Sequence, residues 1–179
     1  LHIGDYFQGF ATKRLAAVDV DKMTSNQHEF NGAAEFRALL GAPAVKTHYP
    51  AFFAYLTDEQ DVAELLESKL TWYDTRGNKP NRSPEYRLYY PALAEPVVCA
   101  ATPSDTLFLA RKNDGALLLV IAQQGSTVLR QLEWIFNSRP EEEGALFVAN
   151  DMRTQPPRNE MASEALLEML GIEIDSSDD

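Results

Sequence analysis

Alternating polar and apolar residues, or short apolar runs, recur along the chain and predict strands. They lie at residues 7–14, 50–56, 70–74, 86–90, 106–112, 116–122 and 145–149. Between the strands at 106–112 and 116–122, Asn113, Asp114 and Gly115 form a strong hairpin signal, because glycine readily adopts the positive φ that tight turns need. The pattern therefore predicts a chain built mainly from β structure.

Apolar residues at helical spacing predict a few short helices, at residues 33–40, 58–69, 126–136 and 159–170. The third follows Gly125 with Ser126 as its N-cap. Its expected buried stripe is Val128, Leu132, Ile135 and Phe136. In the second, Val62, Leu65 and Leu66 lie opposite acidic residues that we interpret as a solvated face. Many strands with few helices favour a mixed α+β, mainly β barrel over a parallel α/β sheet.

The chain has 179 residues, 45% of them apolar, which is enough for one ordinary domain. We expect this domain at residues 1–137 and an acidic connecting segment with one helix at residues 138–179. No apolar run reaches the ~18 residues of a membrane span and no signal sequence is recognisable, so a soluble cytoplasmic protein is expected. The single cysteine, Cys99, excludes an internal disulfide, and its apolar neighbours predict a buried small hydrophobe.

The net charge of −11 argues against nucleic-acid binding, but the charge is unevenly distributed. Residues 141–179 hold eleven Asp or Glu against two Arg, a net −9, which leaves −2 for residues 1–140. Residues 70–91 hold four cations, Arg76, Lys79, Arg82 and Arg87, against two carboxylates, a net +2. The middle of the chain therefore offers a local anion-binding site.

The same segment, residues 70–91, has the composition of an exposed arm. Gly77, Asn78, Pro80, Asn81 and Pro84 favour turns or extended backbone between two strands. Arginine offers a planar fork of donors that fits guanine or phosphate, and glutamate and asparagine accept from base amines. A solvated hairpin whose charges pair with one another remains the alternative.

A second polar cluster lies in residues 13–32. Its row of short hydrogen-bonding side chains resembles a base-reading surface, and comprises Thr24, Ser25, Asn26, Gln27, His28, Glu29 and Asn31. The row is equally compatible with a turn that caps the helix at residues 33–40, since Ser25 and Asn26 are good N-caps.

Together these segments resemble a known family. The runs KRLAAVDVDKMTSNQHEFNG, LTWYDTRGNKPNRSPEYRLYYP and LLLVIAQQGSTVLRQLEWIF are similar to the N-terminal DNA-binding (effector) domain of EcoRII-type type II restriction endonucleases, over residues 5–137. The most specific pieces are SNQHEFNG, WYD-x-R with R-x-x-E-Y-R-L-Y-Y, and the QGST helix start. The resemblance implies a DNA-binding pseudobarrel like the plant B-three domains, in which two arms grip the duplex from the major-groove side.

The resemblance also implies the DNA-binding residues. The first arm, within residues 13–32, would use Lys22, Ser25, Asn26, Gln27, His28, Glu29 and Asn31, and His28 matches a DNA-contacting histidine of the family. The second arm, within residues 70–91, would use Trp72, Asp74, Arg76, Asn78, Lys79, Asn81, Arg82, Glu85 and Arg87. Arg82, Glu85 and Arg87 match an Arg-x-x-Glu-x-Arg contact motif. Pro80 and Pro84 depart from the family by removing amide donors, and Tyr86 by replacing a cation.

No catalytic or metal-binding residue is predicted in this chain. The nearest nuclease-like string, Glu67-Ser68-Lys69, lacks an upstream acidic partner, and His2, His28 and His48 have no metal-ligand spacing. The resemblance implies that the parent is a type II restriction endonuclease, a bacterial cytoplasmic DNA hydrolase. Its nuclease domain, C-terminal in the same parent chain and outside this sequence, would use Mg²⁺.

Three functions remain open from the sequence. The first is a reader of double-stranded DNA that acts as target-recognition or allosteric effector domain of such an enzyme, without a membrane partner. The second is a protein-interaction module that acts through the acidic tail. The third is a single-stranded nucleic-acid or RNA binder that stacks bases on Trp72, Tyr73, Tyr86, Tyr89 and Tyr90.

Overall fold

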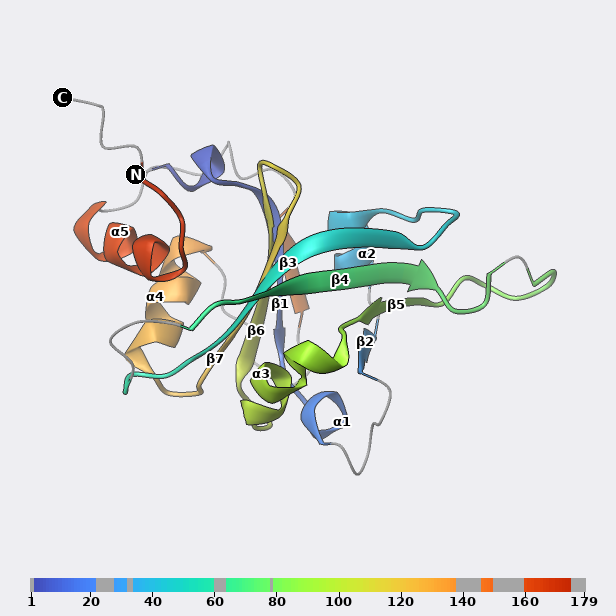
Figure 1. The fold of residues 1–179 in the computed structure, drawn as a ribbon, viewed down its shortest axis with the longest axis horizontal. Helices are drawn as coiled ribbons and strands as arrows, with labels where there is room; N and C mark the ends of the chain where they lie inside the picture. Colours follow the sequence, from blue (N-terminus) through green and yellow to red (C-terminus); the bar gives the residue numbers. More distant parts are fainter. Residues whose placement is uncertain are drawn as a thin grey trace.

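The fold is one curved sheet with short helices on both sides (Figure 1). A computed structural model of the chain describes residues 2–21, 28–31, 34–59, 64–77, 79–137, 146–149 and 160–174. Over these ranges the strands are β1 Phe7–Arg14, β2 Glu29–Asn31, β3 Thr47–Leu56, β4 Leu66–Asp74, β5 Tyr86–Tyr89, β6 Thr106–Lys112, β7 Leu117–Ala122 and β8 Leu146–Ala149. The helices are η1 Ile3–Asp5, α1 Ala17–Val20, α2 Ala34–Leu40, η2 Ala92–Ala94, α3 Glu95–Ala100, α4 Thr127–Ile135 and α5 Glu160–Met169.

The strands follow the order β2-β5-β4-β3-β7-β6-β1-β8. Neighbouring strands are antiparallel except for the central pair of β3 and β7, which is parallel. Helix α2 packs near β8 and β1, and its Phe36 joins the same apolar cluster as Phe30 of β2. The predicted class, a mainly β barrel-like fold with short helices, is confirmed.

Two apolar cores lie on opposite faces of the central strands. Along β6, Leu107 and Leu109 belong to the core that also contains Phe36 and Trp72, whereas Phe108 belongs to the core beneath α4 and α5. Successive strand residues point to opposite faces, so a strand covered on both sides reads as a continuous apolar run. Each fully buried large side chain contributes about 1.5–3 kcal/mol by leaving water.

Helix α4 begins where the sequence predicts. The Ser126 hydroxyl oxygen accepts from the Leu129 amide at 3.1 Å, and the Asp58 carboxylate accepts from the Thr127 and Val128 amides at 2.7 and 3.1 Å. These two amide bonds hold the pKa of Asp58 below its ordinary value. The predicted stripe is buried, namely Val128, Leu132, Ile135 and Phe136.

The helix predicted at residues 58–69 is wrong over its second half. Strand β4 begins at Leu66 and pairs with β3, from Phe53 opposite Leu66 to Pro50 opposite Lys69. Residues 60–63 lie outside the described ranges. Sheet pairing outweighs the weak helical spacing here, because tertiary contacts routinely override local propensity.

Five short elements of the described ranges were not predicted, namely η1, α1, β2, η2 and α3. Helix α3 starts at Glu95 with a proline in its first turn, a favourable position for that residue. Cys99 lies on α3 and is half-buried, so its predicted full burial is wrong. Within the described ranges, no helix is both long and apolar enough to span a membrane.

The described part of residues 138–179 packs against the rest of the fold. Strand β8 pairs with β1, and Leu166 and Leu167 of α5, with Leu170 just after it, lie in the core beneath α4. These two elements therefore contribute to the folded body. A connection from this segment to a further domain stays a prediction.

Candidate nucleic-acid interface

Strands β4 and β5 continue into a hairpin loop, residues 75–85, that projects beyond the body of the sheet (Figure 1). The last rung is a bond from the Thr75 amide to the Glu85 carbonyl at 2.8 Å. Asp74 fixes the base of the loop, because one carboxylate oxygen accepts from the Arg76 amide at 3.0 Å and the Glu85 amide at 2.8 Å. The second arm is therefore an ordered extension of the sheet at its base.

The far part of this loop is exposed and carries two cations. Lys79, Asn81 and Arg82 are all exposed, and Asn81 adopts a φ of 74° that reverses the chain. Among the residues that the structure describes, neither Lys79 nor Arg82 has a side-chain partner. Their charges are thus available to an external anion. Asn78 lies outside the described residues.

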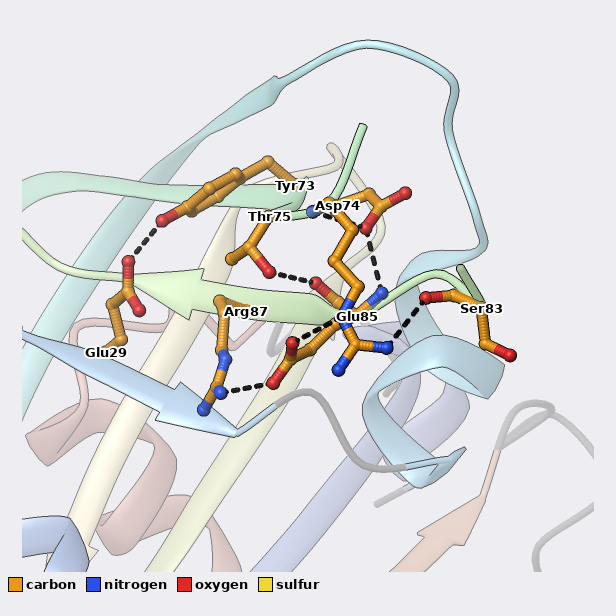
Figure 2. Close-up of polar contacts among 8 residues, drawn as sticks. Glu29, Tyr73, Asp74, Thr75, Ser83, Glu85 and Arg87 are labelled. Atoms are coloured by element: carbon orange, nitrogen blue, oxygen red, sulfur yellow. Dashed lines mark hydrogen bonds and ion pairs between the residues drawn. The ribbon is translucent and has the colours of Figure 1, made fainter. Parts of the chain in front are cut away.

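The other two cations of the arm share one carboxylate. Arg76 Nε lies 2.9 Å from Glu85 Oε2, and Arg87 Nη2 lies 2.5 Å from Glu85 Oε1 (Figure 2). Arg76 Nη1 also donates to the Ser83 carbonyl at 3.1 Å. Arg76 and Arg87 are therefore paired within the hairpin, as the alternative interpretation of this segment expected. Lys79 and Arg82 do not take part in these ion pairs.

The described end of the first arm lies beside the second. Strand β2 pairs with β5, so that Glu29 faces Tyr89 and Asn31 faces Arg87. The two arms therefore start from neighbouring strands. The remaining predicted contacts of the first arm lie outside the described residues, namely Lys22, Ser25, Asn26 and Gln27.

A polar face links the two arms across β2, β5 and β4. Tyr73 donates its hydroxyl to the Glu29 carboxylate (Figure 2), and Lys46 Nζ lies 4.8 Å from the centre of the Tyr73 ring. Burial, and then the bond to Glu29, raise the pKa of Tyr73 to about 12, so Tyr73 is a donor at neutral pH. Sequence reasoning missed both the bond between Tyr73 and Glu29 and the contact between Lys46 and Tyr73.

Contacts with Tyr90 and Glu95 fix the position of His28. Its φ is 54°, its carbonyl accepts from the Tyr90 amide at 2.9 Å, and its ring stacks on Tyr90 with centroids 5.3 Å apart. Its Nε2 lies 3.2 Å from Glu95 Oε2, and the side chain is 28% exposed. A DNA contact by His28 stays a prediction.

The predicted contact by Trp72 is wrong because its side chain is buried. Trp72 is 0% exposed, donates to the Gly41 carbonyl at 2.8 Å and stacks on Tyr86 with centroids 5.1 Å apart. Asp74 is half-buried, and its Oδ1 accepts from two backbone amides of the arm. A DNA contact by Asp74 stays a prediction.

Within the described ranges, no group of three or more His, Cys, Asp or Glu side chains is placed to hold a metal ion. Glu67 and Lys69 lie on strand β4.

No family model matches the chain, and no curated protein matches it. Among solved structures, the B3 domain of UbaLAI restriction endonuclease, crystallised with cognate DNA, is 14% identical to this chain with a TM-score of 0.39. The match covers 78% of this chain and 85% of that one. At this level of similarity, residue roles do not transfer from that domain to this chain.

Proposed function

We propose that this chain is a sequence-specific double-stranded DNA-binding domain that reads the major groove with two arms. The observation that carries the proposal is the projecting loop at residues 75–85, with exposed Lys79 and Arg82 at its tip and Arg76 and Arg87 at its base. The first arm begins on the adjacent strand β2.

The shape and chemistry of the second arm suit the major groove. That groove admits a two-stranded β-ribbon, and each base pair shows a distinct donor and acceptor pattern there. Arg82 and Arg87 have the planar fork that binds guanine bidentately, and Lys79 suits a phosphate as a point charge. In a chain that is acidic overall, a projection with a net positive charge favours polyanion binding at that projection.

Duplex binding is favoured over the stacking of single strands. Of the five aromatic residues that a single-strand binder would use for stacking, three are buried. Trp72 is 0% exposed, and Tyr86 and Tyr90 are 6% exposed. A stacking platform needs an open ring face. The described polar residues in the far part of the second arm, by contrast, are exposed, namely Lys79, Asn81 and Arg82.

On the sequence resemblance, we further propose that the parent is a type II restriction endonuclease, for which this domain is the target-recognition or allosteric effector part. A nuclease domain in the same parent chain would supply the Mg²⁺-dependent chemistry, in a bacterial cytoplasm. The alternative is a protein-interaction module that acts through residues 141–179. It predicts that deletion of residues 141–179 abolishes binding of a protein partner, and that the chain has no affinity for DNA at any salt concentration.

The test is a selection of bound duplexes from a random pool at a fixed salt concentration, followed by titration of the selected and a scrambled duplex. Arg82→Ala is expected to lose about 1–3 kcal/mol of discrimination at one base pair. Lys112→Ala, on the β6–β7 hairpin, is the matched control and should bind like wild type. Absence of enrichment, or single strands that compete as well as the duplex, would contradict the proposal.

A further inference from the structure

We infer that Glu85 is a positioning residue of the second arm and not a base contact: it holds Arg76 and Arg87 in place and restrains their binding to DNA of any sequence. The inference rests on the proposed function. It assigns to Glu85 a role opposite to the one that the contact motif implies.

Both carboxylate oxygens of Glu85 are already engaged. Oε2 accepts from Arg76 Nε at 2.9 Å, and Oε1 accepts from Arg87 Nη2 at 2.5 Å (Figure 2). Both partners in these two bonds are ionised, and charge-assisted hydrogen bonds are about twice as strong as neutral ones. The two guanidinium groups therefore fix the orientation of the carboxylate, and a base amine would reach only the second lone pair of each oxygen.

The backbone of Glu85 is also fixed. Its amide donates to Asp74 Oδ1 at 2.8 Å, and its carbonyl accepts from the Thr75 amide at 2.8 Å and the Thr75 hydroxyl at 3.0 Å. The carboxylate therefore starts from a rigid point at the base of the arm. A rigid support is what a side chain needs to orient its neighbours.

The two arginines are held in different ways. Arg76 is bound at both Nε and Nη1, because it also reaches the Ser83 carbonyl at 3.1 Å, and it ties the two sides of the loop together. Arg87 is paired with Glu85 through Nη2. A guanidinium has five donors, so Arg87 keeps an edge for a bidentate contact while its orientation is set.

The charge of the cluster explains the restraint. Arg76, Glu85 and Arg87 together carry +1, and removal of the carboxylate would leave +2. Binding to any sequence grows with the number of phosphates that cations neutralise, and the salt dependence grows with it. Glu85 therefore lowers non-specific affinity while it aligns Arg87.

The experiment compares wild type, Glu85→Ala and Glu85→Gln on the selected and scrambled duplexes over a salt series. For Glu85→Ala we expect tighter binding to the scrambled duplex and a salt slope steeper by about 1. We expect discrimination to fall by about tenfold, within the range that one bidentate arginine contact contributes. Glu85→Gln, which keeps an acceptor oxygen, should lie between.

Two controls isolate the effect. Asp114→Asn removes a carboxylate charge from the β6–β7 hairpin and should leave discrimination unchanged. In the Arg87→Ala background, Glu85→Ala should no longer reduce discrimination. Glu85→Ala could instead lose affinity for the selected duplex, gain none for the scrambled duplex and relax the preference at a single base pair. That result would show a direct base contact by Glu85 and overturn the inference. Unchanged binding to both duplexes would overturn it as well.

A measurement without DNA separates this inference from the proposed function. Side-chain Nε relaxation by NMR should show Arg76 and Arg87 ordered in wild type and mobile in Glu85→Ala. If Arg76 and Arg87 are mobile in wild type, the inference is overturned, whether or not the protein binds DNA. Ordered arginines in a wild-type protein that selects no duplex refute the proposed function and, with it, a role of Glu85 in DNA reading.

Discussion

Two hairpins of the same sheet differ in what holds them. The β6–β7 hairpin turns at once, with Gly115 at a φ of 90° and the Lys112 amide bonded to the Ala116 carbonyl at 2.8 Å, and every residue of β7 is buried. The β4–β5 loop runs over residues 75–85 and is mostly exposed. The first hairpin is needed to close the core. The second is longer than a chain reversal requires and is ordered by polar contacts.

The difference separates stability from function. Apolar burial stabilises the first hairpin, whereas Asp74 and Glu85 order the base of the second through hydrogen bonds and ion pairs. Exposed ion pairs add little to the free energy of unfolding. Changes in the first hairpin should therefore alter folding, and changes in the second should alter binding.

The largest expected effect lies in the short hairpin. Leu119 of β7 is 0% exposed, so Leu119→Ala should lower the free energy of unfolding by about 2–5 kcal/mol, through reduced apolar burial and the cavity left behind. Urea denaturation measures this loss. The DNA affinity of the folded fraction should be unchanged, and a loss of less than about 1 kcal/mol would show that β7 is not part of a packed core.

The next effect lies at the tip of the arm. Lys79→Ala should reduce the slope of log affinity against log salt by about 1, because Lys79 neutralises one phosphate. The free energy of unfolding should change by less than about 0.5 kcal/mol, as for other exposed positions. Fluorescence anisotropy over a salt series gives the slope, and an unchanged slope would exclude Lys79 from the phosphate contacts.

A smaller effect is expected where the arms meet. Tyr73→Phe removes the hydroxyl that donates a hydrogen bond to Glu29. A double-mutant cycle with Glu29→Gln should show a coupling of about 0.5–1.5 kcal/mol in the free energy of unfolding. The pKa of Tyr73 is raised from 10.0 to about 12. Its contribution is therefore complete below pH 10 and lost as pH rises toward 12. A Tyr73→Phe variant with the same alkaline unfolding as wild type would contradict this assignment.

The smallest effect concerns Asp58, which is exposed. The pKa of Asp58 is lowered from its ordinary value of 3.8, so its charge stabilises the start of α4 fully at pH values above 3.8. This stabilisation is lost as the pH falls through the folded-state pKa. Asp58→Asn should therefore flatten the acid side of the pH–stability profile. Thermal melts between pH 2 and 6 test this, with Glu59→Gln as the neighbouring control, and identical acid profiles would rule out the cap.

Much of the fold followed from local pattern. The strands at residues 7–14 and 106–112, the Asn113-Asp114-Gly115 turn and the Ser126 cap were predicted where they occur, because each has a strong local signal. The start of β4 was missed, since residues 66–69 owe their strand conformation to β3. Strand β2 was missed because its short polar sequence is a strand only beside β5.

The site was predictable in outline but not in its contacts. The cations and turn residues of the second arm indicated an exposed hairpin. Strand alternation alone would have placed Trp72 inside and Tyr73 outside, since neighbouring strand residues face opposite ways. No sequence signal shows that Glu85 binds two arginines, because this depends on the pairing of residues 75 and 85 across the loop.

The most direct test of the central claim shortens the arm. Thr75 and Glu85 are paired, so residues 76–84 can be replaced by Asn-Gly, a turn that fits two opposed strand residues. We predict that affinity for the selected duplex falls about a thousandfold, to the non-specific level, while the melting temperature changes by only a few degrees. Retention of selective duplex binding by the shortened, folded protein would contradict the account.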